Sequence, residues 1–256
     1  MIQLPTDLNS AIAQAREATQ AALDDGYNLV QVELVIPEIE LQAQAIAKEF
    51  IPAILEPDTN LKVFFADTGA AALARRDWGE VSFKVTDLGT SRSPVDSKVE
   101  AEDGRFLLVC PSSIEVAQAE KLSNLAGDRP VVMLLPQLEN VSIVGVGYAA
   151  RQLRERFINK IESCYYLRPG DGFTLFRCYP SPWQVWLEKE EDKYELIAES
   201  PEKPMGDKLD LILAKASGEA IEAPEATDSA DSQATPKPQK KGFMAELQKF
   251  LRALTS

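Results

Sequence analysis

The chain is expected to fold as one α/β domain over residues 1–216, with a Rossmann-like, mostly parallel sheet, helices on both faces, and a C-terminal antiparallel β-meander. Two patterns in the 256-residue sequence predict this. In the first part, short apolar runs alternate with longer segments of helical periodicity, which is typical of βαβ units and a parallel sheet. From residue 164 onward, apolar runs are separated only by short turns, which is typical of antiparallel strands.

Periodicity, caps and breaking residues define the elements in chain order. Apolar residues at three- and four-residue steps predict a helix over residues 6–25, with Thr6 or Asp7 as its N-cap. The run 29–36 is rich in Val and Leu and stops at Pro37, so it is expected to be a strand. By the same criteria we expect helix 38–55, strand 61–66, helix 70–76, strand 81–85, a flexible polar loop at 87–104, strand 105–110, helix 114–126, strand 131–135, a short strand at 142–146 and helix 148–161.

The meander is expected to comprise strands 164–167, 173–179, 183–189 and 194–199, closed by a helix at 205–216. Trp183 and Trp186 are three residues apart, so they should point to opposite faces of one strand. We expect one of them to belong to the core and the other to be partly exposed as a partner contact.

The C-terminus has a different composition. Residues 217–239 form an acidic Pro/Ala/Ser linker that is expected to be disordered, and residues 240–256 are expected to form a basic amphipathic helix. Its apolar stripe is flanked by cations, a pattern typical of docking on an anionic membrane surface or in a partner groove. The stripe contains Phe243, Leu247, Phe250, Leu251 and Leu254, and the cations are Lys240, Lys241, Lys249 and Arg252. The alternative is a helix that folds back onto its own domain.

Composition excludes several classes of function. The net charge is −13, and because the tail 236–256 is positive by 4 and the linker negative by 5, the body has a charge of −12 and is not expected to bind nucleic acid or to contact an anionic membrane. The absence of histidine excludes histidine-based catalysis and metal sites. The three cysteines are scattered, which suits free thiols in a reducing compartment. No apolar run approaches the length of a bilayer span and no targeting segment is evident, so a cytoplasmic location is expected, with no metal and no cofactor.

Candidate ligand sites lie where predicted strands end. Asp67-Thr68-Gly69, Pro111-Ser112-Ser113 and Pro136-Gln137 are polar junctions, and ligands of open parallel sheets bind beyond the carboxyl ends of the strands. The first two junctions open helices, whose free N–H groups favour an anion. The alternative is that Thr68, Ser112 and Ser113 only cap helices.

Two further patterns bear on phosphate binding. Gly145 and Gly147 belong to a stretch, GVGYAA, that matches the letters of the dinucleotide fingerprint. It comes late in the chain and no acidic residue ends the next strand, so a tight turn into a helix explains it better. Arg75 and Arg151 lie in locally basic segments that suit phosphate or carboxylate recognition, or else make i,i+4 pairs on helix surfaces.

Four stretches together resemble a family of cyanobacterial and chloroplast proteins described as a domain of unknown function. They are residues 67–78, 147–157, 162–169 and 182–186, and the resemblance extends over residues 4–213. Plant members include the stromal "low photosystem II accumulation" protein three, and a similar domain is appended to a plastid adenylate kinase. The resemblance implies a soluble factor for photosystem II assembly that works with assembly intermediates or a thylakoid insertase. It implies no catalytic residues.

The sequence therefore supports two hypotheses. The first is a non-enzymatic photosystem II assembly factor, which is held at the thylakoid surface by its C-terminal helix. The second is an enzyme or sensor that binds a nucleotide or phosphorylated small molecule at the strand ends, lined by Asp67, Thr68, Gly69, Ser112 and Ser113, with Arg75 or Arg151.

Overall fold

The computed structural model describes residues 3–90, 92–138, 148–190 and 193–217. The strands of this part are β1 (Leu29–Leu34), β2 (Asn60–Phe65), β3 (Lys84–Asp87), β4 (Asp103–Val109), β5 (Val131–Leu134), β6 (Glu162–Pro169), β7 (Phe173–Cys178), β8 (Trp183–Glu190) and β9 (Lys193–Ser200). The helices are α1 (Leu8–Asp24), α2 (Ala43–Phe50), α3 (Thr68–Trp78), α4 (Val116–Ala126), α5 (Tyr148–Arg156) and α6 (Asp207–Ser217), with short 3-10 turns η1 (Ile39–Gln42), η2 (Ile51–Ala53), η3 (Val95–Lys98) and η4 (Ile158–Lys160).

All the described strands form one sheet, in the order β3-β2-β4-β5-β1-β6-β7-β8-β9. Neighbouring strands from β3 to β6 run parallel, and those from β6 to β9 run antiparallel. The predicted fold class, a mostly parallel sheet continued by an antiparallel meander, is confirmed. The parallel strands β1 to β6 all end at one edge of the sheet, which we call the carboxyl edge.

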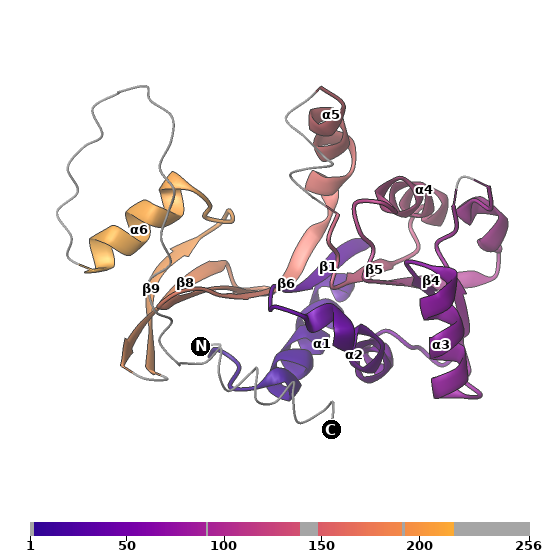
Figure 1. Ribbon diagram of the computed structural model, residues 1–256, viewed down its shortest axis with the longest axis horizontal. Coiled ribbons are helices and arrows are strands. Elements are labelled where there is room, and N and C mark those ends of the chain that lie inside the picture. The colour runs from indigo at the N-terminus through magenta and orange to yellow at the C-terminus, as the bar shows by residue number, and fades with distance from the viewer. Residues whose placement is uncertain (1–2, 91, 139–147, 191–192, 218–256) are drawn as a thin grey trace.

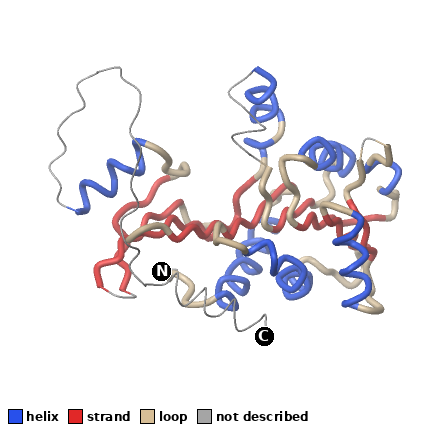
Figure 2. Tube along the Cα trace, viewed as in Figure 1, coloured by secondary structure: helices blue, strands red, loops and turns tan. Residues whose placement is uncertain are grey.

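Helices cover both faces of the sheet, as predicted. Helices α1, α2 and α3 lie on one face, and α4, α5 and α6 lie on the other (Figures 1 and 2). The first face packs into one large core cluster that includes Phe50 and Tyr165. The second face carries a cluster beneath α4 and α5, with Phe64 and Phe106, and a smaller cluster beneath α6. Because central strands are buried on both faces, they have the continuous apolar runs seen in the sequence.

The first helix begins where the sequence predicts. Asp7 is its N-cap: the Asp7 carboxylate accepts a hydrogen bond from the Ser10 amide at 2.7 Å, and Ser10 Oγ accepts one from the Asp7 amide at 3.1 Å. This capping box satisfies donors that the first helical turn leaves unpaired. The hydrogen bond from the Ser10 amide lowers the pKa of Asp7.

Two predicted helices differ from single α-helices. Residues 39–53 are helical without a gap, but only α2 has α-helical geometry, with η1 before it and η2 after it. The segment begins after Glu38, whose φ of 61° lies outside a right-handed helix. In place of helix 148–161 the chain forms α5 and η4, separated by Phe157 at φ −132° and ψ −65°. A periodic apolar pattern does not reveal such local breaks.

The third strand and the loop after it also differ from the prediction. β3 begins at Lys84 instead of Val81, since its pairing with β2 extends from Lys62↔Lys84 to Phe65↔Asp87. The loop predicted to be flexible is anchored in its described part, where Leu88 and Val95 have no exposed surface and η3 is formed. The short strand predicted at 142–146 lies outside the described residues.

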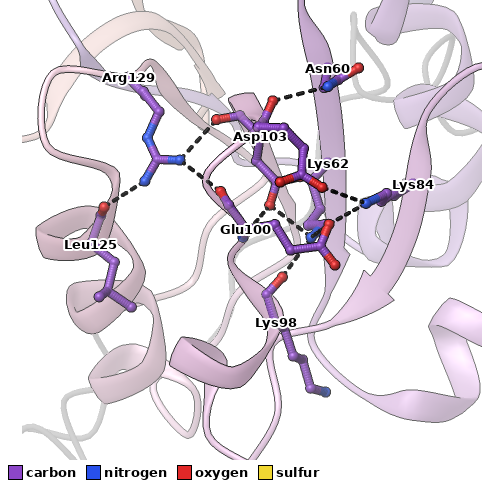
Figure 3. Close-up of polar contacts among 9 residues, drawn as sticks. Asn60, Lys62, Lys84, Lys98, Glu100, Asp103, Leu125 and Arg129 are labelled. Carbon is purple, nitrogen blue, oxygen red and sulfur yellow. Dashed lines mark hydrogen bonds and ion pairs between the residues drawn. The ribbon is translucent and has the colours of Figure 1, made fainter.

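A buried ion pair at the opposite, amino edge fixes this loop (Figure 3). Lys62 of β2 contacts the Asp103 carboxylate at 2.7 Å and donates to the Lys98 carbonyl at 2.6 Å. Asp103 also accepts from the Glu100 amide at 2.8 Å, and Arg129 donates to the Asp103 carbonyl at 2.8 Å. These contacts join the starts of β2 and β4 to the segment between β3 and β4.

The two tryptophans of β8 lie on opposite faces, as predicted. Trp183 packs in the cluster beneath α6, and Trp186 packs in the large core on the other face. Both are buried, at 4% and 9% exposure, so the expectation of one partly exposed tryptophan is wrong. Only the first half of β8 is buried on both faces, and Lys189 and Glu190 at its end are exposed.

Candidate functional site: a crevice at the carboxyl edge

Neighbouring strands β1 and β5 send the chain to opposite faces of the sheet. β1 leads to α2 on one face, and β5 leads to α5 on the other. Such a reversal opens a crevice beyond the carboxyl ends of the strands, the usual ligand site of doubly wound sheets. A cavity of about 600 Å³ lies here, lined by residues 33–37 and 39 around the end of β1, residues 135–137 after β5, and Arg168 and Pro169 of β6. We call it the carboxyl-edge crevice.

The backbone is strained where strands leave this part of the sheet. Among the described residues, three non-glycine residues have positive φ: Glu38 at 61°, Cys110 at 49° and Leu135 at 54°. They follow β1, β4 and β5, three strands whose carboxyl ends are adjacent. Each left-handed residue costs about 1–2 kcal/mol, and such strain concentrates at functional sites. The edge is therefore a rigid, costly feature of the fold.

Prolines stand at the ends of four neighbouring strands. Pro37, Pro111 and Pro136 follow β1, β4 and β5 closely, and Pro169 is the last residue of β6. Proline has a fixed φ and no N–H donor. A phosphate cradle needs successive free N–H groups. The crevice walls are therefore better suited to contact with side chains than to binding an anion through the backbone.

Glu33 is the carboxylate of the crevice lining and is held in place from two sides. It accepts hydrogen bonds from Ser163 Oγ at 2.8 Å and Gln31 Nε2 at 2.9 Å. Lys203 Nζ lies 3.8 Å from the Glu33 carboxylate. The orientation of this charge is thus set before any ligand arrives.

Lys203 also contacts two aromatic rings beside the crevice. Its ammonium lies 3.8 Å from the ring centroid of Tyr166 and 5.3 Å from that of Trp183. Burial raises the pKa of Tyr166 to about 12, and the Glu33 charge adds to the shift, so the phenol is neutral at physiological pH. One carboxylate and two rings therefore surround a single ammonium, an arrangement that stabilises cations.

The two predicted helix-opening junctions meet at the same edge, because β2 and β4 are neighbours. Asp67 is the N-cap of α3 and accepts from the Ala70 amide at 2.9 Å. The amide and hydroxyl of Ser112 donate to the Glu115 carboxylate at 3.1 Å and 2.6 Å. At both junctions, therefore, hydrogen-bond donors that a ligand could use are already bound to a carboxylate of the chain itself.

The remaining predicted ligand residues are dispersed. Thr68 and Gly69 are exposed in the first turn of α3, whereas Ser113 is buried. Arg75, two turns further along α3, donates to the Val85 carbonyl of β3 at 2.9 Å. Arg151 is exposed on α5. Gly145 and Gly147 lie outside the described residues, as do all the residues of the predicted C-terminal helix and linker from 218 onward.

Sequence reasoning did not assign Glu33, Arg168 and Lys203 to a site. Glu33 had one visible signal, an acidic residue within an otherwise apolar strand. Repeated prolines after strands were a second signal. No signal in the sequence indicated the contact between Lys203 and Glu33, because this contact depends on how the chain after β9 returns to the sheet.

Large apolar side chains are exposed on the connections that follow three of these strands, although none of them lines the crevice. The three most exposed large apolar residues of the described part are Ile114 at 78%, Tyr148 at 78% and Leu41 at 74%. Each stands on the connection that follows β4, β5 or β1. Cys110, at the end of β4, is an inert thiol, since burial and the charge of Glu40 raise its pKa to about 12.

The fold and this edge define a doubly wound α/β domain with a crevice at its topological switch point. The chain belongs to the family described as a domain of unknown function (DUF1995), whose model matches residues 5–211. The resemblance to a domain-of-unknown-function family is therefore confirmed at that level. No helix within the described ranges combines the length and apolarity needed to cross a bilayer.

Proposed function

We propose that the chain is a non-enzymatic assembly factor for photosystem II, whose α/β domain binds a protein partner at the carboxyl edge. The observation that carries this proposal is the exposure of Leu41, Ile114 and Tyr148 on three connections that follow adjacent strands. Large apolar side chains left exposed on neighbouring connections are candidates for contact with a partner protein. The resemblance to photosystem II accumulation proteins favours assembly intermediates or a thylakoid insertase as partners.

Binding of a nucleotide or phosphorylated small molecule is the alternative, and the cavity volume of about 600 Å³ suits a ligand of that size. Electrostatics favour the protein partner. Asp67 already occupies a donor at the start of α3, and Glu115 occupies the donors of Ser112 at the junction before α4, so a phosphate would have to approach two carboxylates. Thermal-shift measurements with nucleotides and sugar phosphates test this alternative: a rise in Tm that Ser112→Ala abolishes would favour it over partner binding.

In this proposal, the C-terminal tail holds the protein at the thylakoid surface. Its sequence pattern suits weak, reversible contact with an anionic thylakoid surface, to which each basic residue adds about 1 kcal/mol. Phe250→Asp in the full chain places a charge within the apolar stripe, and Ala245→Asp places the same charge on the opposite side of the helix. Co-sedimentation with anionic vesicles should fall for Phe250→Asp much more than for Ala245→Asp. Equal effects would argue against the helix.

Deletion of the gene in a cyanobacterial host tests the assembly role. Photosystem II core complexes should decrease on native gels, and the wild-type gene should restore them. The double variant Leu41→Ser with Ile114→Ser should restore them poorly. Leu125→Ser is the control, because Leu125 is 39% exposed and lies in the last turn of α4, beside Arg129 at the amino edge. Normal accumulation in the deletion strain would refute the assembly role.

A further inference from the structure

We infer that the carboxyl-edge crevice binds a small organic acid, whose carboxylate pairs with Arg168 and whose apolar body fills the space beyond the ends of β1 and β5. The inference goes beyond the assembly role, because it assigns a ligand to a cavity that the exposed apolar residues of the proposed partner surface do not line. It follows from the walls of the cavity, from the charges in and beside it, and from the positions of its polar side chains.

The walls of the crevice are apolar and already formed. Its volume of about 600 Å³ lies within the range of roughly 300–1,000 Å³ that is usual for small-molecule sites. The lining residues other than Glu33, Gln137 and Arg168 are all aliphatic residues or prolines. Those that also belong to the core are only 3–5% exposed: Leu34, Ile36, Ile39 and Leu135. Since the fold already holds these side chains in place, little ordering is needed when a ligand binds.

The charges of the crevice favour an anion. The Glu33 carboxylate lies 3.8 Å from the Lys203 ammonium, so these two opposite charges offset each other. Arg168 is the other charged residue of the lining, and no carboxylate within the described ranges forms an ion pair with it. The lining together with Lys203 therefore has one net positive charge, and a ligand with one negative charge is its electrostatic complement.

Arg168 is fixed by the sheet and by its neighbour Tyr166. Its backbone is paired with Leu175 of β7, near the end of β6. Burial and the charge of Glu33 raise the pKa of Tyr166 to about 12, and Arg168 beside the phenol opposes this rise. The exposed guanidinium thus starts from a regular strand and lies near a neutral hydroxyl. A guanidinium binds a carboxylate through two parallel hydrogen bonds, which fixes the direction of the ligand as well as its charge.

Gln137 is the second polar group that a ligand meets. It follows β5, whereas Arg168 lies near the end of β6, and β1 runs between these strands, so about 10 Å separates the two backbones. The Gln137 amide nitrogen of the backbone donates to the Pro111 carbonyl at 2.8 Å, which holds the residue in place. The expected ligand therefore has a carboxylate at one end, an apolar middle across the end of β1, and a hydroxyl or carbonyl group at the other end.

The same charges distinguish a carboxylate from a phosphate. A phosphate monoester has close to two negative charges at neutral pH, and the crevice offers one cation beside the Glu33 carboxylate. Glu38 and Glu40 are exposed on the connection after β1 and oppose any further negative charge. The prolines of the walls cannot supply the backbone donors that a phosphate needs. A planar acid with a single charge is the anion that fits.

Isothermal titration calorimetry of the full chain tests the inference with three matched probes. They are 6-hydroxy-2-naphthylacetate, its uncharged amide, and the phosphonate of the same skeleton. The acid should bind at least about tenfold more tightly than the amide, and the phosphonate should bind no more tightly than the acid. Equal affinities of acid and amide would overturn the inference, as would tighter binding of the phosphonate or no binding of the acid at about 1 mM.

Variants of exposed residues locate the site without removing core side chains. Arg168→Gln should lower the affinity for the acid about tenfold or more, to that of the amide, whereas Arg168→Lys keeps the charge without the paired hydrogen bonds and should lie between. Val35→Trp should weaken acid and amide alike, because Val35 lines the crevice at 46% exposure and the larger ring occupies its space. Arg76→Gln is the matched control, since Arg76 is a 73% exposed arginine in the last turn of α3.

The variants also separate the crevice from the basic tail, which is another possible site for an acid. If Arg168→Gln bound the acid as tightly as the wild type, the acid would be held elsewhere and the inference would be wrong. The same conclusion would follow if Val35→Trp left both affinities unchanged, or if Arg76→Gln weakened the acid as much as Arg168→Gln. Thermal melts of each variant, followed by circular dichroism, show that the compared proteins are folded.

Discussion

The ion pair between Lys62 and Asp103 gives a quantitative test of the fold. The two side chains are 4% and 1% exposed, and their charged atoms lie 2.7 Å apart. At an effective dielectric constant of about 20, the attraction at this distance is about 6 kcal/mol. Removing two ions from water costs several kcal/mol each. The intact pair is therefore close to neutral for stability, but loss of Asp103 leaves the buried Lys62 ammonium with only the half-exposed Glu100 carboxylate, 3.4 Å away.

Asp103→Ala should consequently destabilise the domain by about 3–5 kcal/mol, the cost typical of breaking a buried pair. For a domain of this size, that corresponds to a fall in Tm of roughly 6–20 °C. Lys62→Met with Asp103→Leu removes both charges next to the apolar side chains of Phe64 and Phe106. This double variant should be clearly more stable than Asp103→Ala, because no ion is left unpaired.

Urea unfolding of the full chain, followed by circular dichroism, provides the measurement. Lys193→Ala is a suitable control, since the Lys193–Glu190 pair is 74% and 68% exposed and such pairs contribute little. The reasoning is refuted if Asp103→Ala unfolds within about 1 kcal/mol of the wild type. It is equally refuted if the double variant is less stable than Asp103→Ala.

The other predictions concern pH and two local contacts. Burial raises the pKa of Cys164 to about 12 and that of Cys178 to about 11. Both thiols are neutral when folded, so their contribution to the free energy of unfolding should be fully present below about pH 9 and should be lost as the pH rises toward about 11–12. A urea midpoint that does not change from about pH 8 to pH 10.5 would contradict this. Gly89→Ala should destabilise by about 1–3 kcal/mol, because Gly89 has φ 82° and a Cβ there would lie 2.1 Å from the Ser93 carbonyl oxygen. Lys203→Met should lower stability by about 1 kcal/mol through loss of its contacts with two rings, and an unchanged Tm would count against those contacts.

The layered α/β architecture could be predicted because its cause is local. Strands buried on both faces must be apolar along their length, and β2, with Val63, Phe64 and Phe65 buried, shows this directly. The antiparallel meander was visible because its turns are short. Both features depend on residues close together in the chain.

The order of strands and the crevice could not be predicted, because they depend on distant contacts. The sequence pattern of a βαβ unit is the same whatever positions its strands take in the sheet. No residue near β1 in the sequence therefore indicates that β1 lies between β5 and β6. The kink at Glu38 breaks no sequence rule, since a non-glycine residue at φ 61° is held there by its surroundings. The role of Glu33 required knowing where Lys203 returns to the sheet.

The strand ends also distinguish this domain from doubly wound domains that bind dinucleotides. Those folds place glycine after the strand, so that free N–H groups can approach a phosphate. Here β1, β4 and β5 lead closely into Pro37, Pro111 and Pro136. Where a helix does open at this edge, as at Asp67, a carboxylate takes the position a phosphate would need. The same switch point thus has prolines, and a capping carboxylate at Asp67, where a dinucleotide site has free N–H groups, and this argues against a phosphate ligand bound through the backbone.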